Sequence, residues 1–167
     1  MEEGRTPVLY YSNSNIATEE EYRKRLSWVK KLAQYHHLEL LTDPYDHESW
    51  LRHVSVLSEF HSFPEGGKRC EKCFEWSLGR AGAEAERRSM NFCTSLTVSP
   101  HKNSKLIFSI GMRWNHFEPY DFKKKDGFKR SLELSAQFGF YRQAFCGCEY
   151  SLRGGESKVN NISAIQK

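Results

Sequence analysis

Residues 8–42 read VLYYSNSNIATEEEYRKRLSWVKKLAQYHHLELLT, and this stretch decides the fold class. Its first apolar run, Val8–Tyr11, stops at the turn-forming residues Ser12–Asn15, which predicts a short buried strand followed by a loop. Thr18–Tyr35 begins with a capping box and continues with apolar residues at helical spacing, which predicts a helix. A second apolar run, Leu38–Leu41, predicts another strand. Because parallel neighbours need such a helical crossover, the stretch indicates an α/β fold with a parallel sheet and flanking helices.

The rest of the chain continues the alternation of helices with short apolar runs. The elements that we predict are a helix capped by Asp46 with Trp50, Val54 and Leu57 on its inner face, a helix at Lys68–Arg88, a strand at Phe92–Leu96, a helix at Lys102–Met112 and a helix at Phe128–Phe138 ended by Gly139. In a parallel sheet, the loops at the carboxyl ends of the strands build the site. Those loops are Ser12–Asn15, Thr42–Asp46 and Thr97–Asn103.

The composition of the 167 residues limits the class of protein. Hydrophobic residues make up 38% and aromatic residues 14% of the chain, which excludes a wholly disordered protein. The net charge of +4 is compatible with an RNA or phosphate partner. No apolar run approaches the roughly 20 residues that span a bilayer, and the polar start carries no signal-peptide pattern. We therefore expect a cytoplasmic protein without a membrane partner, with one domain at residues 1–152 and a disordered tail at 153–167.

Five cysteines, an odd number, argue against a framework of structural disulfides and favour metal or redox chemistry. Cys70 and Cys73 form a C-x-x-C motif at the start of a predicted helix, whose positive end favours a thiolate. Half of a metal or cluster site, a thioredoxin-like dithiol and two unremarkable thiols all remain open for this motif. Cys93 stands alone in an apolar run, and we predict that it is a buried small hydrophobic residue.

Cys146 and Cys148 flank a single glycine, Gly147. A disulfide across one intervening residue closes a small ring, and glycine supplies the backbone freedom that the ring needs. Small strained disulfides are easily reduced, which suits a reversible redox pair rather than a structural bridge. The same two thiols would also complete a C-x-x-C…C-x-C zinc site, and the spacing leaves both interpretations open.

Two stretches carry candidate RNA contacts. His101 and Lys102 lie where a predicted strand ends and a helix begins, a place suited to a phosphate or an anionic intermediate, although a simple helix cap is an equal alternative. Residues 121–130, DFKKKDGFKR, interleave cations with two Phe, a pattern that suits single-stranded RNA better than a solvated loop. The basic candidates in and beyond this segment are Lys123, Lys124, Lys125, Arg130 and Arg142.

Four long motifs, in the same order, resemble the QueH-type epoxyqueuosine reductases. They are PEGGKRCEKCF (Pro64–Phe74), TSLTVSPHKN (Thr94–Asn103), DFKKKDGFKRSLELS (Asp121–Ser135) and FGFYRQAFCGC (Phe138–Cys148). The earlier YYSNSNI and EEYRKRL also fit, so that the resemblance covers nearly all of residues 8–152. It implies a fold related to the nucleotide α-hydrolase (HUP) group. It also implies reduction of epoxyqueuosine to queuosine at the wobble position of tRNA, the last step of queuosine biosynthesis.

The resemblance also implies cofactors, partners and roles for four cysteines. It implies a [4Fe–4S] cluster and allows for additional iron, with Cys70 and Cys73 matching two of the four cluster ligands. By position, Cys146 and Cys148 match the redox-active disulfide of the family. The implied partners are a tRNA with a queuosine-type anticodon and an electron donor that the sequence does not identify. Removing an epoxide oxygen consumes two electrons and two protons, which a dithiol that closes to a disulfide supplies.

The sequence departs from the family pattern in one respect. The other two cluster ligands of the family are an adjacent Cys-Cys pair after its first strand, and the sequence has no cysteine before Cys70. We therefore expect the sequence to start at the family's second strand and to lack the first. Two alternative functions remain: a degenerate, non-catalytic tRNA-binding paralogue, and an RNA-binding module in which the four paired cysteines bind zinc.

Overall fold

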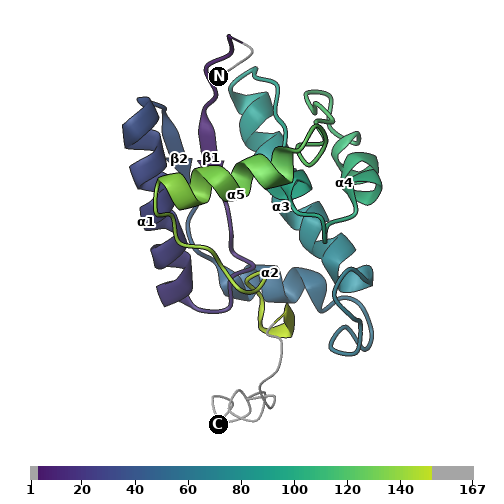
Figure 1. Cartoon of the computed structure of the whole chain (residues 1–167). Helices are drawn as coiled ribbons and strands as arrows, with labels where there is room; N and C mark the ends of the chain where they lie inside the picture. Colours follow the sequence, from purple (N-terminus) through teal and green to yellow (C-terminus); the bar gives the residue numbers. More distant parts are fainter. Residues whose placement is uncertain (1–3, 152–167) are drawn as a thin grey trace.

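Two short parallel strands, β1 (Leu9–Tyr11) and β2 (Leu40–Thr42), form the sheet of the computed structural model, which describes residues 4–151. Leu9 pairs with Leu40 and Tyr11 pairs with Thr42. Helix α1 (Glu19–His36) makes the crossover between the strands, and the Thr18 hydroxyl accepts a hydrogen bond from the backbone N–H of Glu21, as the capping box predicts. The predicted strand–helix–strand unit is confirmed (Figure 1).

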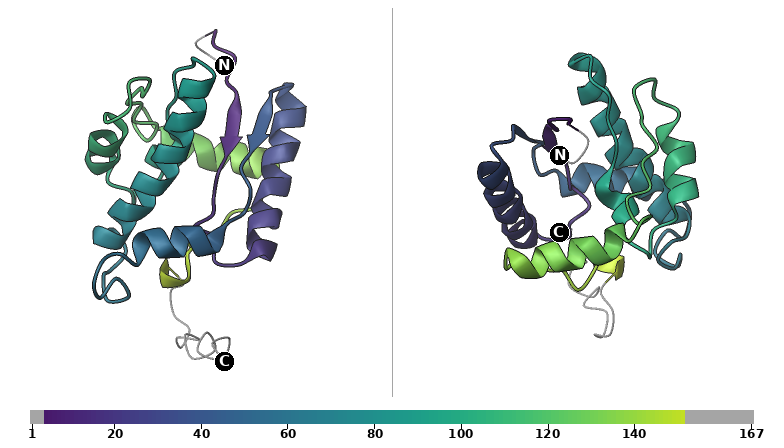
Figure 2. Two further views of the ribbon diagram at one scale, coloured as in Figure 1. Left: turned by 180° about the vertical axis from the view of Figure 1, so that it is seen from behind. Right: turned by 45° about the horizontal axis from the view of Figure 1, so that its top comes forward.

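The remaining elements surround this unit. They are α2 (His47–Val54), α3 (Lys68–Arg87), the 3₁₀ turn η1 (Ser95–Val98), α4 (Ser104–Gly111), α5 (Gly127–Gln137) and the 3₁₀ turn η2 (Glu149–Ser151). Asp46 caps α2 as predicted, and Gly139 follows α5 with a positive φ of 61°. Figures 1 and 2 show α1 on one side of the strands, α3 and α4 on the other, and α5 crossing over the strands between the two sides.

The predicted third strand at Phe92–Leu96 is wrong. A single parallel bridge joins Phe92 to Phe117, and the Thr94 hydroxyl then accepts a hydrogen bond from the backbone of Leu96 to start η1. Such a local side-chain bond competes with the backbone ladder of a sheet. Cys93 is exposed, which corrects the prediction that it is buried; its neighbour Phe92 packs on the core, so Cys93 faces the other side of this extended segment. The α/β class is confirmed, whereas the relation to the HUP group stays a prediction.

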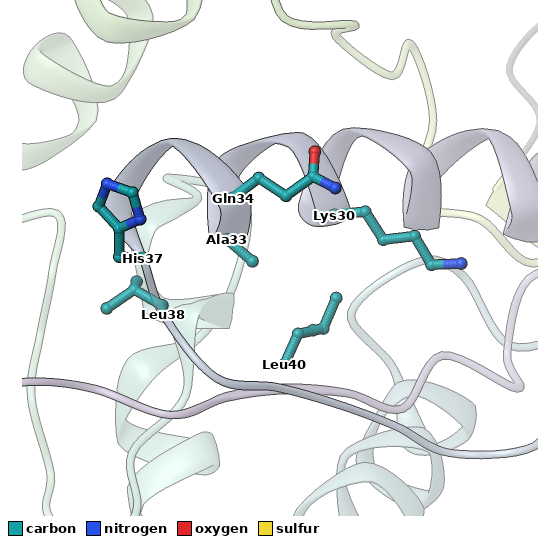
Figure 3. A pocket seen from close by; sticks show the side chains of 6 residues that line it. All are labelled: Lys30, Ala33, Gln34, His37, Leu38 and Leu40. Carbon is teal, nitrogen blue, oxygen red and sulfur yellow. The ribbon is translucent and has the colours of Figure 1, made fainter.

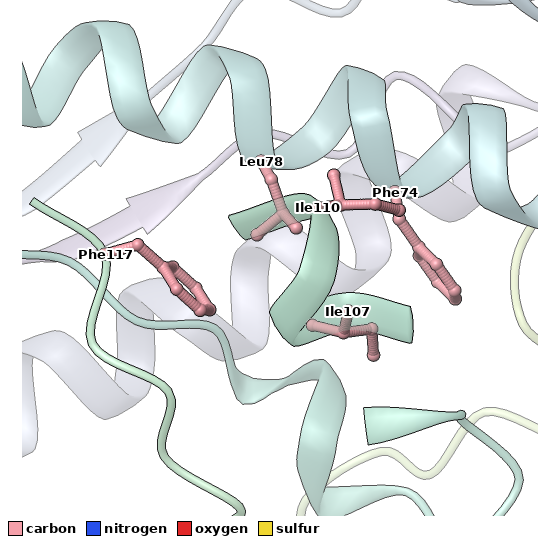
Figure 4. Packing of buried hydrophobic residues seen from close by; sticks show 5 residues of the cluster. All are labelled: Phe74, Leu78, Ile107, Ile110 and Phe117. Atoms are coloured by element: carbon pink, nitrogen blue, oxygen red, sulfur yellow. The ribbon is translucent and has the colours of Figure 1, made fainter. Parts of the chain in front are cut away.

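Three clusters of buried side chains hold the elements together. The largest joins α3 to α4 and contains Phe74, Leu78, Ile107, Ile110 and Phe117 (Figure 4). A second cluster, of Tyr11, Ile16 and Tyr22, fixes β1 and its following loop to α1. The third contains Trp50, Val54 and Cys148 and joins α2 to the C-terminal turn. This third cluster positions the cysteines.

The C-terminal end of α1 and β2 line a shallow pocket of about 430 Å³. Figure 3 shows its lining residues, Lys30, Ala33, Gln34, His37, Leu38 and Leu40. No cysteine lines this pocket, which therefore adds nothing to the thiol chemistry. Within residues 4–151, no helix is long and apolar enough to cross a membrane. The predicted tail at 153–167 lies outside the described residues.

Candidate functional site

The fold brings the two cysteine motifs together. Cys73, on α3, and Cys148, after α5, both pack against the cluster of Trp50 and Val54. The other three thiols of the two motifs act electrostatically on Cys73, where they add to the effect of burial and raise its pKa. All five cysteines are free thiols in this structure. The disulfide between Cys146 and Cys148 stays a prediction for the oxidised protein.

The Cys73 thiol lies beside the indole N–H of Trp50. Burial raises the pKa of its thiol, and the indole N–H of Trp50 acts in the opposite direction. This N–H makes no full hydrogen bond to any of the described residues. A thiolate accepts a stronger hydrogen bond than a thiol, so the unsatisfied N–H fits a deprotonated or metal-bound Cys73.

The donor set nevertheless falls short of a complete metal site. Cys70 Sγ accepts a hydrogen bond from the backbone N–H of Gly66 at 3.2 Å, so this thiol is also held in place. Among residues 4–151, which include all five cysteines, no three Cys, His, Asp or Glu side chains gather closely enough to bind one ion. Cys70 and Cys73 fit two ligand positions, but the residues present do not fit a full [4Fe–4S] cluster or a four-cysteine zinc site.

The Cys146–Cys148 turn docks on the loop that follows β1. Gly147 has a φ of +139°, and a Cβ there would approach Asn15 and Arg25 to 3.3 Å. Its carbonyl accepts a hydrogen bond from the backbone N–H of Ala17 at 3.0 Å, and Arg25 donates to the Cys146 carbonyl at 2.9 Å. This φ favours glycine, and a Cβ would also require its neighbours to shift by a few tenths of an ångström. The chain that follows β1 therefore contacts the Cys146–Cys148 turn.

The loop before α4 contributes Lys102. Its Nζ lies 3.0 Å from Cys146 Sγ and 3.5 Å from a carboxylate oxygen of Glu65, with 11% of the side chain exposed. Burial alone lowers the pKa of Lys102, but its electrostatic interaction and hydrogen bond with Cys146, together with the electrostatic effects of Cys70 and Glu65, outweigh burial and raise the pKa. His101, in contrast, is exposed. Of the predicted pair, Lys102 points to the thiols and His101 to the surface.

The basic candidates in residues 121–130 and Arg142 also divide into one side chain that contacts the loop before α4 and others that are exposed. Lys123 Nζ contacts Ser104 Oγ and donates to the Lys102 carbonyl at 3.3 Å, so this side chain supports the loop before α4. Phe122 is exposed and stacks on Tyr120, with ring centroids 5.7 Å apart. Of the basic candidates, Lys124, Lys125, Arg130 and Arg142 are exposed at the surface.

His47 is a site neighbour that the sequence did not single out. Its Nδ1 lies 2.8 Å from the Ser14 carbonyl, its Nε2 lies 3.5 Å from Glu149, and its ring stacks on Trp50. The one available signal was its place in the chain, directly after Asp46, which ends the loop at the carboxyl end of β2. Arg25 carried no signal, because its carbonyl partners lie at the far end of the sequence.

Comparison with known proteins places these residues in a family context. A family model described as "Epoxyqueuosine reductase QueH" matches residues 1–154. A protein named epoxyqueuosine reductase QueH from Streptococcus pyogenes serotype M1 is 32% identical over 95% of this chain, and the match spans 64% of that relative. Proteins of the same name from Thermotoga maritima and Staphylococcus aureus are 32% and 31% identical, over 95% and 86% of this chain and 86% and 65% of their own lengths.

Proposed function

The chain belongs to the epoxyqueuosine reductase QueH family, and from that premise we propose that it reduces epoxyqueuosine to queuosine at the wobble position of tRNA. The observation that carries the proposal is the meeting of the two cysteine motifs at one cluster, where Cys73 and Cys148 share contacts with α2. Neither motif alone distinguishes a reductase from a zinc-binding module. Together, a half-buried C-x-x-C thiol pair and a glycine-linked thiol pair favour redox chemistry.

Cys146 and Cys148 supply the electrons in this proposal. The reaction removes the epoxide oxygen as water and leaves a carbon–carbon double bond, which needs two electrons and two protons. Two thiols that become one disulfide provide both, so that epoxide and dithiol give alkene, disulfide and water. A reductant of thiol or hydride class must then restore the dithiol for the next turnover.

The assignment of a [4Fe–4S] cluster to this protein extends the family resemblance. Cys70 and Cys73 would hold it as thiolates, and such a cluster would supply electron relay or polarise the epoxide oxygen. The described residues offer two of the four ligands, so the proposed redox step depends on Cys146 and Cys148 alone.

The proposed substrate is the anticodon loop of a tRNA with a queuosine-type anticodon. Unstacked loop bases leave the helix easily and stack on aromatic or Arg side chains, while cations contact the phosphates. The exposed Phe122, Lys124 and Lys125 form such a surface, and they flank Lys123, which supports the loop that carries Lys102. The RNA surface and the thiols are thus linked through one loop.

Nucleoside mass spectrometry of tRNA that contains epoxyqueuosine tests the function. The full chain, kept anaerobic with iron, sulfide and dithiothreitol, is expected to convert epoxyqueuosine to queuosine. Cys146→Ser and Cys148→Ser should each abolish conversion, whereas Cys93→Ser, at an exposed thiol outside both motifs, should retain it. Conversion by a Cys146→Ser/Cys148→Ser double variant would refute the assigned redox pair, and no conversion by the native chain would refute the function.

A further inference from the structure

The contact between Lys102 and Cys146 is the most informative feature that the family comparison does not assign. A lysine that serves only to bind RNA has no reason to bury its ammonium group, since burial costs hydration. Lys102 is instead almost fully covered and directs Nζ at Cys146 Sγ, 3.0 Å away. Asn103, the next residue, caps α4 by accepting a hydrogen bond from the backbone N–H of Leu106, so helix α4 fixes the loop that carries Lys102.

The two thiols of the Cys146–Cys148 turn have unequal surroundings. Cys146 is half-buried, faces an ammonium group, and has its carbonyl held by Arg25. Cys148 is 8% exposed, and burial raises the pKa of its thiol. A nearby cation favours the thiolate, which is the reactive form, whereas an apolar environment favours the neutral thiol. The geometry therefore distinguishes an outer sulfur that faces an ammonium group from an inner sulfur that is buried.

We propose that Lys102 is a positioning residue of the thiol pair: its ammonium group holds Cys146 as the sulfur that reacts first, and Cys148 then closes the disulfide. The inference rests on the proposed function for the identity of the substrate. The order of the thiols applies to any electrophile, and glutathione disulfide shows it in balanced steps. Cys146 thiolate attacks one sulfur and releases one glutathione thiolate. Cys148 then attacks the mixed disulfide, and its proton leaves with the second glutathione.

The charges around Lys102 allow a test in which two substitutions should have opposite effects on Cys146. Glu65, before α3, shares the ammonium group at 3.5 Å, and Cys70 also acts on it electrostatically. Lys123 approaches from the 121–127 segment but contacts the Lys102 carbonyl rather than the ammonium group. If Lys102 acts on Cys146, the loss of Lys102 weakens the thiolate, and the loss of Glu65, a competing and repelling anion, strengthens it. If Lys102 and Glu65 form only a structural ion pair, the two losses act alike.

The experiment measures thiol reactivity of the full chain in a Cys93→Ser background, without tRNA. Alkylation of Cys146 by iodoacetamide is followed by peptide mass from pH 6 to pH 10, and the dithiol is equilibrated with glutathione. Lys102→Met should slow alkylation at pH 7 about tenfold, move its pH profile upward, and shift the equilibrium about tenfold toward the disulfide, because the reduced form loses its cation. Glu65→Gln should move the alkylation rate, its pH profile and the glutathione equilibrium in the opposite direction.

Two further variants serve as controls. Lys102→Arg keeps the cation and should stay within about threefold of the native rate. Lys105→Met removes an exposed lysine of α4 and should change nothing. Equal alkylation rates of Lys102→Met and native protein would overturn the inference. A shift of Glu65→Gln in the same direction as Lys102→Met would also overturn it. Both outcomes count even if Lys102→Met folds poorly. Native protein that shows these thiol effects but leaves epoxyqueuosine unchanged would instead refute the function and keep the inference.

Discussion

Asp43 shows at the residue scale how one carboxylate ties the sheet to α3. It follows β2, accepts a hydrogen bond from Ser12 Oγ at 2.7 Å, and binds the Arg80 guanidinium through two nitrogens. Asp43→Asn should lower the free energy of unfolding by about 1–3 kcal/mol, since it leaves Arg80 without its counter-ion in a part-buried place. The matched control is Glu133→Gln. Because its partner Arg130 is exposed, we expect this variant to change the free energy of unfolding by less than about 1 kcal/mol. Urea unfolding at pH 7 measures the free energy of unfolding of both variants. Equal decreases would contradict the role of Asp43 in tying the sheet to α3.

His47 predicts a pH dependence of stability. Burial alone lowers its pKa, but Glu149 and the Ser14 carbonyl outweigh burial and raise the pKa above the usual 6.5. A pKa that folding raises means that the folded state holds the proton more tightly. This contribution to stability is complete below pH 6.5 and is lost as the pH rises through the folded pKa. The native protein should therefore exceed Glu149→Gln in unfolding free energy by more at about pH 6 than at about pH 8. Urea unfolding across this range measures the difference, and a constant difference contradicts the prediction.

At the scale of elements, the packing of α3 discriminates between two of its glycines. A Cβ on Gly82 would come within 2.5 Å of the Trp114 ring, whereas a Cβ on Gly79 would meet it at an ordinary 3.6 Å. Both positions gain up to about 1 kcal/mol of helix propensity from alanine. Gly79→Ala should therefore raise the melting temperature, while Gly82→Ala should lower it, because overpacking costs about 1–3 kcal/mol. Thermal unfolding of the two variants decides, and stabilisation of both would show that Trp114 moves aside freely.

The segment before α5 carries the prediction for RNA. Lys124 and Lys125 are exposed, so Lys124→Ala/Lys125→Ala should weaken binding to an anticodon stem-loop and reduce the slope of log affinity against log salt by about 2. The variant Lys30→Ala/Lys31→Ala removes the same charge from α1, which lies at the other end of α5 (Figure 1), and should change the slope little. Fluorescence anisotropy at several salt concentrations measures both. Equal effects of the two variants on affinity and salt slope would mean that RNA binding depends on the overall charge of the protein and not on this surface.

At the scale of the whole molecule, the sequence predicts the helix caps but neither the loss of the third strand nor the long-range contacts of the site. The caps at Thr18 and Asp46 locate two helices, because such hydrogen bonds join residues three apart. The run at Phe92–Leu96 looked like a strand, since apolar content does not reveal that Thr94 will bond locally. The pairing of Lys102 with Cys146 joins residues 44 positions apart, and no spacing rule reaches that far. The C-x-x-C and C-x-C motifs were visible as chemistry, but their meeting depends on the complete fold.

The third cluster predicts that α2 controls access to a thiol far away in the sequence. Val54 is 0% exposed and packs with Trp50 against Cys148, so this thiol should react only when the cluster opens. Val54→Ala should cost about 1.5–3 kcal/mol and speed labelling of Cys148 about 10- to 100-fold.

The test follows labelling by a disulfide reagent in a Cys146→Ser background, with the exposed Cys93 as the internal reference. Val56→Ala, at a residue that is 72% exposed, is the matched control and should leave the rate unchanged. Faster labelling of Cys148 in Val54→Ala alone would show that α2 and the C-terminal turn open as one unit, which a reversible disulfide needs if its inner sulfur is to stay protected between turnovers. An unchanged rate would mean that the turn opens without α2, and the inner thiol would then lack the protection that its burial predicts.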